Sequence, residues 1–106
     1  MLDSALAPID VLPEVVEAVG KRTTVIVDSG FRRGSDIVKA LALGARLVLI
    51  GRATLYGTAV GGEAGATRAI NLLGEELERT LALIGCSSVA ELSAAHVILP
   101  KADAAQ

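Results

Sequence analysis

Residues 25–36 read VIVDSGFRRGSD, residues 39–45 read KALALGA and residues 47–52 read LVLIGR. This order predicts a buried strand, a glycine-rich loop with arginines, a helix, a second buried strand and a second loop of glycine and arginine. Two strands joined through one helix run parallel as neighbours, so both loops follow strand ends at the same edge of a sheet. Two such loops predict a cradle for a phosphate group.

The loop residues have the chemistry that a phosphate site needs. Gly30 and Gly34 let the backbone approach a ligand closely, and backbone N–H groups of the loop can point at an anion. The helix start at Ser35 and Asp36 adds a favourable dipole. Arg32 and Arg52 offer planar, charged donors, and Asp28 suits the hydroxyl groups of a ribityl or ribose chain. The alternative is that the glycines only turn the chain and the arginines are solvated. Repetition of the pattern at two consecutive strand ends favours the cradle.

Composition narrows the class of protein. Of 106 residues, 52% are hydrophobic and 2% aromatic, which favours helices on a parallel sheet over an aromatic-rich sandwich. The net charge of −2 argues against nucleic acid as a partner. Cys86 is the single cysteine, so no intrachain disulfide is expected and a reducing, cytoplasmic setting is favoured. No apolar run reaches the roughly 18 residues that span a bilayer.

Periodicity and capping residues predict the order of elements along the chain. We expect a helix N-capped by Asp10 and ended by Gly20, a strand at 24–27, a helix at 36–43 capped by Ser35, a strand at 47–50, a glycine-rich turn at 57–65, a helix at 66–83, a short helix opened by Ser88 and Glu91, and a flexible tail at 101–106. Two strands are too few for an independent parallel sheet. The chain is therefore expected to be part of a larger fold, or to self-associate and so cover its apolar strands.

Four side chains outside the loops are expected to be structural. Glu75 and Glu76 fit the solvated face of the long helix. His96, the single histidine, is expected at the surface or at a helix end, away from both strand ends. Cys86 is expected to be a buried, inert thiol with no histidine nearby.

The motifs resemble those of one enzyme family. Over residues 2–92 the sequence resembles the C-terminal end of the FMN-dependent α-hydroxy acid dehydrogenases and oxidases. The residues of its first loop are most similar to those of the (S)-mandelate dehydrogenase branch. The resemblance is carried by DSGFRRGSDI at 28–37, KALALGA at 39–45, GRATLYG at 51–57, GGEAG at 61–65, EL at 76–77 and TLALIGC at 80–86. Most relatives in this family have glycine where Ser29 stands and an aliphatic residue where Phe31 stands.

The resemblance implies an α/β fold and a cofactor. Residues 1–106 would form a single partial domain, the C-terminal portion of a TIM (β/α)8 barrel with about strands 7 and 8 and their helices. FMN would be the cofactor, with Arg32 and Arg52 on its ribityl phosphate and Arg33 at the surface or behind the site. The residues implied to line the FMN pocket are Asp28, Ser29, Gly30, Phe31, Arg32, Gly51 and Arg52. No residue is implied as a metal ligand.

The implied activity is oxidation of an (S)-2-hydroxy acid of the mandelate, lactate or glycolate type to a 2-oxo acid, by hydride transfer to FMN. The family's histidine base and its substrate-binding arginine lie in a stretch that precedes the region resembled here. The chain alone is therefore expected to be inactive, and its status as an enzyme stays open. One alternative is a non-catalytic, self-associating fragment without a cofactor. Another is a segment of a different phosphate-binding barrel enzyme, of the inosine-monophosphate dehydrogenase type.

Partners and location are expected on the same grounds. FMN and further copies of this chain are the expected partners, with a 2-hydroxy acid bound only by the full-length enzyme and no nucleic acid. The expected location is the cytoplasm, and a position peripheral to the inner membrane stays open for a full-length relative.

Overall fold

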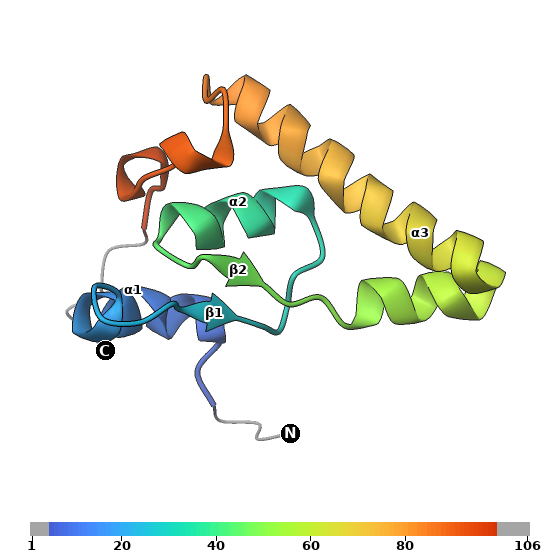
Figure 1. Cartoon of the computed structure of the whole chain (residues 1–106), viewed down its shortest axis with the longest axis horizontal. Helices are drawn as coiled ribbons and strands as arrows, with labels where there is room; N and C mark the ends of the chain where they lie inside the picture. The colour runs from blue at the N-terminus through green and yellow to red at the C-terminus, as the bar shows by residue number, and fades with distance from the viewer. Residues whose placement is uncertain (1–4, 100–106) are drawn as a thin grey trace, which may run out of the picture.

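The computed structural model describes residues 5–99, and the expected tail at 101–106 lies outside them. The elements in chain order are α1 (Pro8–Val19), β1 (Ile26–Val27), α2 (Gly34–Ala42), β2 (Leu47–Val48), α3 (Arg52–Leu83) and the 3-10 turns η1 (Val89–Glu91) and η2 (Ala94–His96). α1 lies beside β1, and α2 packs against both β2 and α3 (Figure 1). The predicted succession of strand, helix, strand and helix is confirmed.

The two strands form a short parallel sheet. Ile26 pairs with Leu47 and Val27 with Val48. The Leu49 N–H donates to the Val27 carbonyl at 2.9 Å, which continues the ladder just past β2. Parallel pairing through a helical crossover is therefore confirmed, although both strands are shorter than expected. Because they run in the same direction, the loops that follow β1 and β2 leave the sheet at the same edge.

α1 begins earlier than its capping residues predicted. Ala7 takes the N-cap position with extended dihedral angles (φ −65°, ψ 138°), and Pro8 follows where the helix needs no N–H donor. The expectation that Asp10 caps this helix is wrong; Asp10 lies in the first turn, where its charge suits the helix dipole. Pro13 lies inside the helix, and Gly20 ends it as predicted.

The core lies between the sheet and the helices. Its buried members are Leu12, Val25, Val27, Phe31, Ile37, Ala40, Leu43, Ala45 and Leu73. A smaller cluster of Val38, Leu81 and Cys86 joins α2 to the far end of α3. Gly34, the first residue of α2, is buried against α3 so closely that an added Cβ would collide with the backbone of Glu76 and Leu77. The absence of a side chain at this position lets the start of α2 contact α3.

α3 is broken at one point. Gly61 (φ −145°) and Gly62 (φ 60°, ψ −140°) leave the helical region, so a short arm folds back against a long arm (Figure 1). The backbones of Gly57 and Gly65 touch across the break, because neither residue has a Cβ. The glycine-rich turn expected here is confirmed only at its centre, since the remainder is helical. Across residues 5–99 no helix, α3 included, is both long and apolar enough to cross a bilayer.

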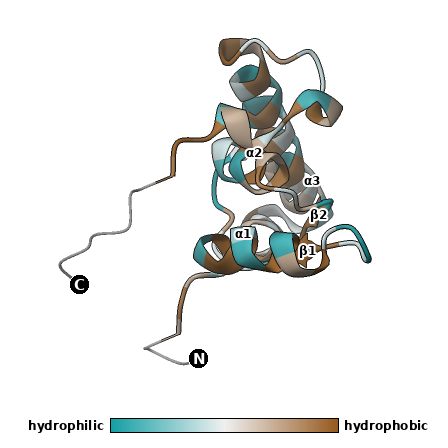
Figure 2. Cartoon of the chain, turned by 90° about the vertical axis from the view of Figure 1, so that its left-hand side faces the viewer, coloured by the Kyte–Doolittle hydropathy of each residue, from teal (hydrophilic) through white to brown (hydrophobic). Residues whose placement is uncertain are grey.

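Apolar side chains of the sheet remain open to solvent. Ile26 is 49% exposed, Leu47 56% and Leu49 55%. Figure 2 shows hydrophobic colour along the last described segment as well, where Ile98 is 98% exposed. The expectation that the strands present uncovered apolar surface is confirmed, because two strands leave one side of the sheet without a packing partner.

The helix expected after Ser88 is replaced by the two turns η1 and η2. The carboxylate of Glu91 accepts from the N–H of Ser87 at 3.1 Å and from its hydroxyl at 2.6 Å, one residue before the predicted cap. These bonds hold the pKa of Glu91 below its usual value of 4.5.

Candidate functional site

Two loops meet at the carboxyl edge of the sheet. The first runs over residues 28–33 after β1, and the second over residues 49–51 after β2. The structure brings all seven residues implied for the site to this edge, namely Asp28, Ser29, Gly30, Phe31 and Arg32 in the first loop and Gly51 and Arg52 at the start of α3. All except Phe31 are exposed. The edge is therefore accessible to a ligand.

The first loop turns at two consecutive residues with left-handed backbone. Ser29 has φ 78° and Gly30 has φ 85°. An added Cβ at Gly30 would meet nothing within 4 Å, so the backbone there faces open space. Ser29, Gly30 and Phe31 border a cavity of about 350 Å³ that Pro8 and Lys39 also line. A cavity next to exposed backbone is a geometry in which a ligand can approach closely.

Phe31 is placed differently from the other implied residues. It is only 9% exposed and belongs to the main core with Val27 and Ile37. Its side chain therefore anchors the first loop to the core while it borders the cavity. An aromatic ring of this size contributes apolar contact that an aliphatic residue would supply less fully.

The amides at the end of the first loop are held by two carboxylates. Asp36 Oδ2 accepts from the N–H of Arg32 at 3.1 Å and from that of Arg33 at 3.0 Å. Glu76 Oε1 accepts from the N–H of Gly34 at 2.8 Å. The expectation that the backbone N–H groups of this loop point at an anion is therefore wrong at Arg32, Arg33 and Gly34, because side chains of the protein already accept from them. Ser35 does not cap this helix either; Arg33 occupies the N-cap position.

Glu76 is a residue that the sequence did not single out for the site. It was expected on a solvated face, yet it also accepts from Arg33 Nε at 3.0 Å. The bond from Arg33, followed by that from Gly34, holds the pKa of Glu76 below 4.5, and the same carboxylate raises the pKa of Arg33. Glu75 instead forms a long pair with Arg68, with 3.7 Å between Arg68 Nη1 and the carboxylate. The motif EL at 76–77 is part of the family resemblance, but neither it nor the local sequence gave Glu76 a contact with the first loop.

The guanidinium groups of Arg32 and Arg52 are available to bind an anion. Within residues 5–99 neither of them forms an ion pair, whereas Arg33 pairs with Glu76. Arg52 is the first residue of α3, after Gly51 at the N-cap. The Thr54 hydroxyl donates to the Gly51 carbonyl at 3.0 Å. The first N–H groups of a helix have no acceptor within it, so the start of α3 adds backbone donors to the two guanidinium groups.

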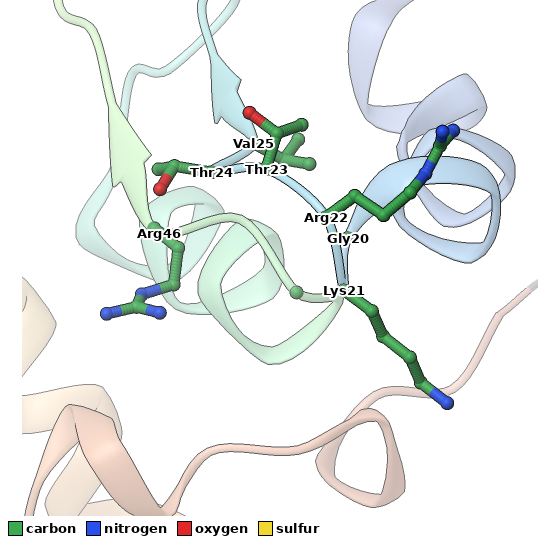
Figure 3. Close-up of a pocket in the computed structure, with 8 residues that line it drawn as sticks. Gly20, Lys21, Arg22, Thr23, Thr24, Val25 and Arg46 are labelled. Carbon is green, nitrogen blue, oxygen red and sulfur yellow. The ribbon is translucent and has the colours of Figure 1, made fainter.

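A second group of cations lies at the opposite end of the strands. Lys21, Arg22 and Arg46 border a cavity of about 300 Å³ that also includes Thr23 and Thr24. Figure 3 shows that the Arg22 side chain extends away from those of Lys21 and Arg46. The three cationic side chains of this group do not converge on one point. The length of the sheet separates the group from Arg32 and Arg52.

Cys86 and His96 form a contact that the sequence did not predict. Cys86 is buried as expected, but His96 Nε2 lies 3.3 Å from its Sγ. The statement that no histidine lies near this thiol is therefore wrong. His96 Nδ1 accepts from the Ser93 N–H at 3.1 Å, so the neutral ring carries its proton on Nε2 and donates it to sulfur. The pair joins η2 to the end of α3, and His96 belongs to neither loop of the candidate site.

Within residues 5–99, no three or more side chains of histidine, cysteine, aspartate or glutamate lie close enough together to hold a metal ion.

Comparison with known proteins identifies a family. A family model of FMN-dependent dehydrogenases matches residues 1–99. An L-lactate oxidase of Nostoc sp. is 51% identical over 98 residues, which cover 92% of this chain and 27% of that protein. An (S)-mandelate dehydrogenase of Pseudomonas putida is 56% identical over 92 residues, or 87% of this chain and 23% of that protein.

The fold is similar to that of a solved relative. The crystal structure of a soluble mutant of the membrane-associated (S)-mandelate dehydrogenase from Pseudomonas putida matches with a TM-score of 0.86 at 53% identity, covering 91% of this chain and 27% of that one. Neighbours of this kind are TIM-barrel flavoenzymes. The chain spans about a quarter of the length of the curated relatives it matches.

Proposed function

The chain belongs to the family of FMN-dependent dehydrogenases, and from this membership we propose that its two loops bind the ribityl phosphate of FMN. The observation that carries the proposal is the position of Arg32 and Arg52 at one edge of the sheet, neither paired with a carboxylate within residues 5–99. Guanidinium groups bind phosphate oxygens through paired N–H donors. The chemistry of this donor set fits a dianionic phosphate.

Each implied residue has a role in this proposal. Arg32 and Arg52 bind the phosphate, and the backbone at Gly51 adds N–H donors at the start of α3. Ser29 and Gly30 shape the open turn beside the cavity. Asp28, at the end of β1, accepts from ribityl hydroxyl groups. Phe31 holds the loop in place from the core.

We further propose that this cofactor site serves oxidation of an (S)-2-hydroxy acid to a 2-oxo acid. The relatives described as L-lactate oxidase and (S)-mandelate dehydrogenase support this substrate class, and 56% identity to the latter favours the mandelate type. Bound FMN would supply the hydride acceptor. The chain would correspond to the last quarter of a TIM barrel, and His96, bonded to Cys86, would not act as the base. Residues of this chain bind the cofactor, and the chain alone would not turn over substrate.

The proposal is tested by titrating the purified chain with FMN and with riboflavin, which lacks the phosphate, while flavin fluorescence is recorded. We expect FMN to bind more tightly than riboflavin. The double variant Arg32→Ala/Arg52→Ala should remove this preference, at a cost of about 3 kcal/mol for two charge-assisted contacts. Arg46→Ala, in the other cation group, is the matched control and should leave it intact. Equal binding of both flavins by the unmodified chain would refute the phosphate site.

The exposed apolar sheet supports a second proposal, that the isolated chain self-associates. Ile26, Leu47 and Leu49 lie half exposed on a two-stranded sheet with unpaired edges. Light scattering after size exclusion should give a mass above 10.8 kDa. A monodisperse monomer would contradict it. A cytoplasmic location is proposed on the single, free cysteine.

A further inference from the structure

Glu76 joins the first loop to α3. Its Oε1 accepts from the N–H of Gly34 at 2.8 Å, and both carboxylate oxygens accept from Arg33 Nε, at 3.0 and 3.2 Å. The partners are separated by 42 and 43 residues in the chain. One side chain of α3 therefore fixes the point where the loop ends and α2 begins.

The bond to Gly34 constrains the loop more than the bond to Arg33. Gly34 is buried, and its backbone touches that of Glu76 and Leu77. A buried N–H that loses its acceptor is left without a replacement from water, which makes this contact hard to break. The Arg33 side chain, by contrast, is 70% exposed, and an exposed ion pair adds little.

The same contact gives the two adjacent arginines different tasks. The backbone N–H groups of both arginines donate to Asp36 Oδ2, so the two residues share one backbone anchor and differ in their side chains. Arg33 is turned toward α3, where Glu76 neutralises it. The Arg32 guanidinium, by contrast, forms no ion pair within residues 5–99, so its side chain stays available to an anion.

We propose that Glu76 is a positioning residue for the phosphate site: it fixes Gly34 and occupies Arg33, so that Arg32 is the arginine presented to the phosphate of FMN. This inference rests on the proposed function, since it names how the same site is built. Glu76 itself does not touch the ligand. It acts through the loop, as Asp36 does from within α2 by accepting from the N–H groups of Arg32 and Arg33.

A graded set of variants tests the inference. Glu76→Ala removes charge and acceptor, Glu76→Gln keeps an oxygen for Gly34, and Glu75→Ala is the matched control one position earlier in α3. FMN and riboflavin affinities are measured for each by fluorescence titration. We expect Glu76→Ala to weaken FMN about tenfold with riboflavin unchanged, which corresponds to about 1.4 kcal/mol, and Glu76→Gln to restore part of the loss. A purely structural role would weaken both flavins together and would not respond to the conservative variant.

Amide hydrogen exchange at Gly34 provides an independent readout without ligand. Exchange should accelerate in Glu76→Ala and stay slow in Glu75→Ala, while the Ala45 amide, which donates to Ala40, serves as a reference for global stability. If the unmodified chain prefers FMN and Glu76→Ala binds it equally well, the inference is overturned and the proposed function stands. If the unmodified chain shows no preference for FMN, the proposed function fails, and unchanged Gly34 exchange in Glu76→Ala would then overturn the positioning role as well.

Discussion

The two loops at the carboxyl edge of the sheet are built in different ways. The first, over residues 28–33, is fixed by Phe31 in the core and by carboxylates from Asp36 and Glu76. The second, over residues 49–51, is held more lightly: Ile50 packs against the same core but is only partly buried, Leu49 is 55% exposed, and an added Cβ at Gly51 would meet nothing within 4 Å. Both loops contact the core, but only the first is also fixed by side-chain carboxylates, one of them from distant α3.

The difference lies in what each loop offers to a ligand. In the first loop the backbone N–H groups of Arg32 and Arg33 donate to Asp36, so the donor left for a ligand is the Arg32 side chain. The second keeps the free N–H groups of a helix start beside Arg52. Stability should therefore depend more on the buried Phe31 of the first loop than on the half-exposed Leu49 of the second, whereas ligand binding should depend on both loops.

The largest expected effect comes from the anchor of the first loop. Phe31→Ala should lower the free energy of unfolding by about 3 kcal/mol, because it opens a cavity in the main core. Leu49→Ala, the matched change in the second loop, should cost less than about 1 kcal/mol, since that side chain is half exposed. Urea denaturation of both variants measures the two values. Equal losses would break the distinction between the loops.

The next effect concerns the contact between the first loop and α3. Gly34→Ala should destabilise the fold by about 2 kcal/mol, because the new methyl group would collide with the backbone of Glu76 and Leu77. Gly74 lies in α3, where an added Cβ would meet open space, so Gly74→Ala should instead raise the free energy of unfolding by about 0.5–1 kcal/mol through helix propensity. Thermal or urea unfolding would show the opposite signs. A neutral Gly34→Ala would mean that the close approach is not required.

A smaller effect is expected at the strained turn. Ser29 has φ 78°, a conformation that glycine adopts with less cost. Ser29→Gly should therefore raise the free energy of unfolding by up to about 1 kcal/mol, less the entropy that glycine loses on folding. Gly30→Ala, at φ 85°, should lower it by a similar amount. Stabilisation by the second change would show that this turn is not left-handed in solution.

The smallest effect is a pH dependence carried by Glu76. Its folded pKa lies below the usual 4.5, so its contribution to stability is fully present above that value and is lost as the pH falls through the folded pKa. The difference in urea midpoint between the unmodified chain and Glu76→Gln should therefore be present at pH 7 and shrink below pH 4.5. Glu91 also has a lowered pKa, and this comparison cancels its share. A difference that grows in acid would contradict the assigned sign.

Local patterns predicted the loops, the parallel strands and the helix between them. Each of these depends on neighbouring residues: buried β-branched runs, glycines at turns and arginines after strand ends. The position of Phe31 in the core and the bonds of Glu76 could not be read in this way, because they depend on the packing of α2 against α3. Glu75 and Glu76 are the same residue type one position apart, and only the rotation of α3 decides which of them reaches Gly34.

The predicted bounds of several elements were wrong for related reasons. Asp10 is a residue type that often caps a helix, but α1 already begins at Pro8, whose missing N–H costs nothing at the first helical position. The glycines near the break of α3 predicted a long turn, whereas the contact of Gly57 with Gly65 lets two helical arms pack closely and confines the turn to two residues. The proximity of Cys86 and His96 depends on the path of η1 and η2 after α3, which has no periodic signal.

The central claim is that FMN binds through its phosphate at the edge where both loops meet. Backbone amide chemical shifts of the labelled chain, recorded as FMN is added and then as riboflavin is added, test it most directly. We expect shifts with FMN at residues 29–32 and 51–54, which riboflavin does not reproduce. Shifts confined to Lys21, Arg22 and Arg46 at the opposite end of the strands, or none at either end, would contradict it.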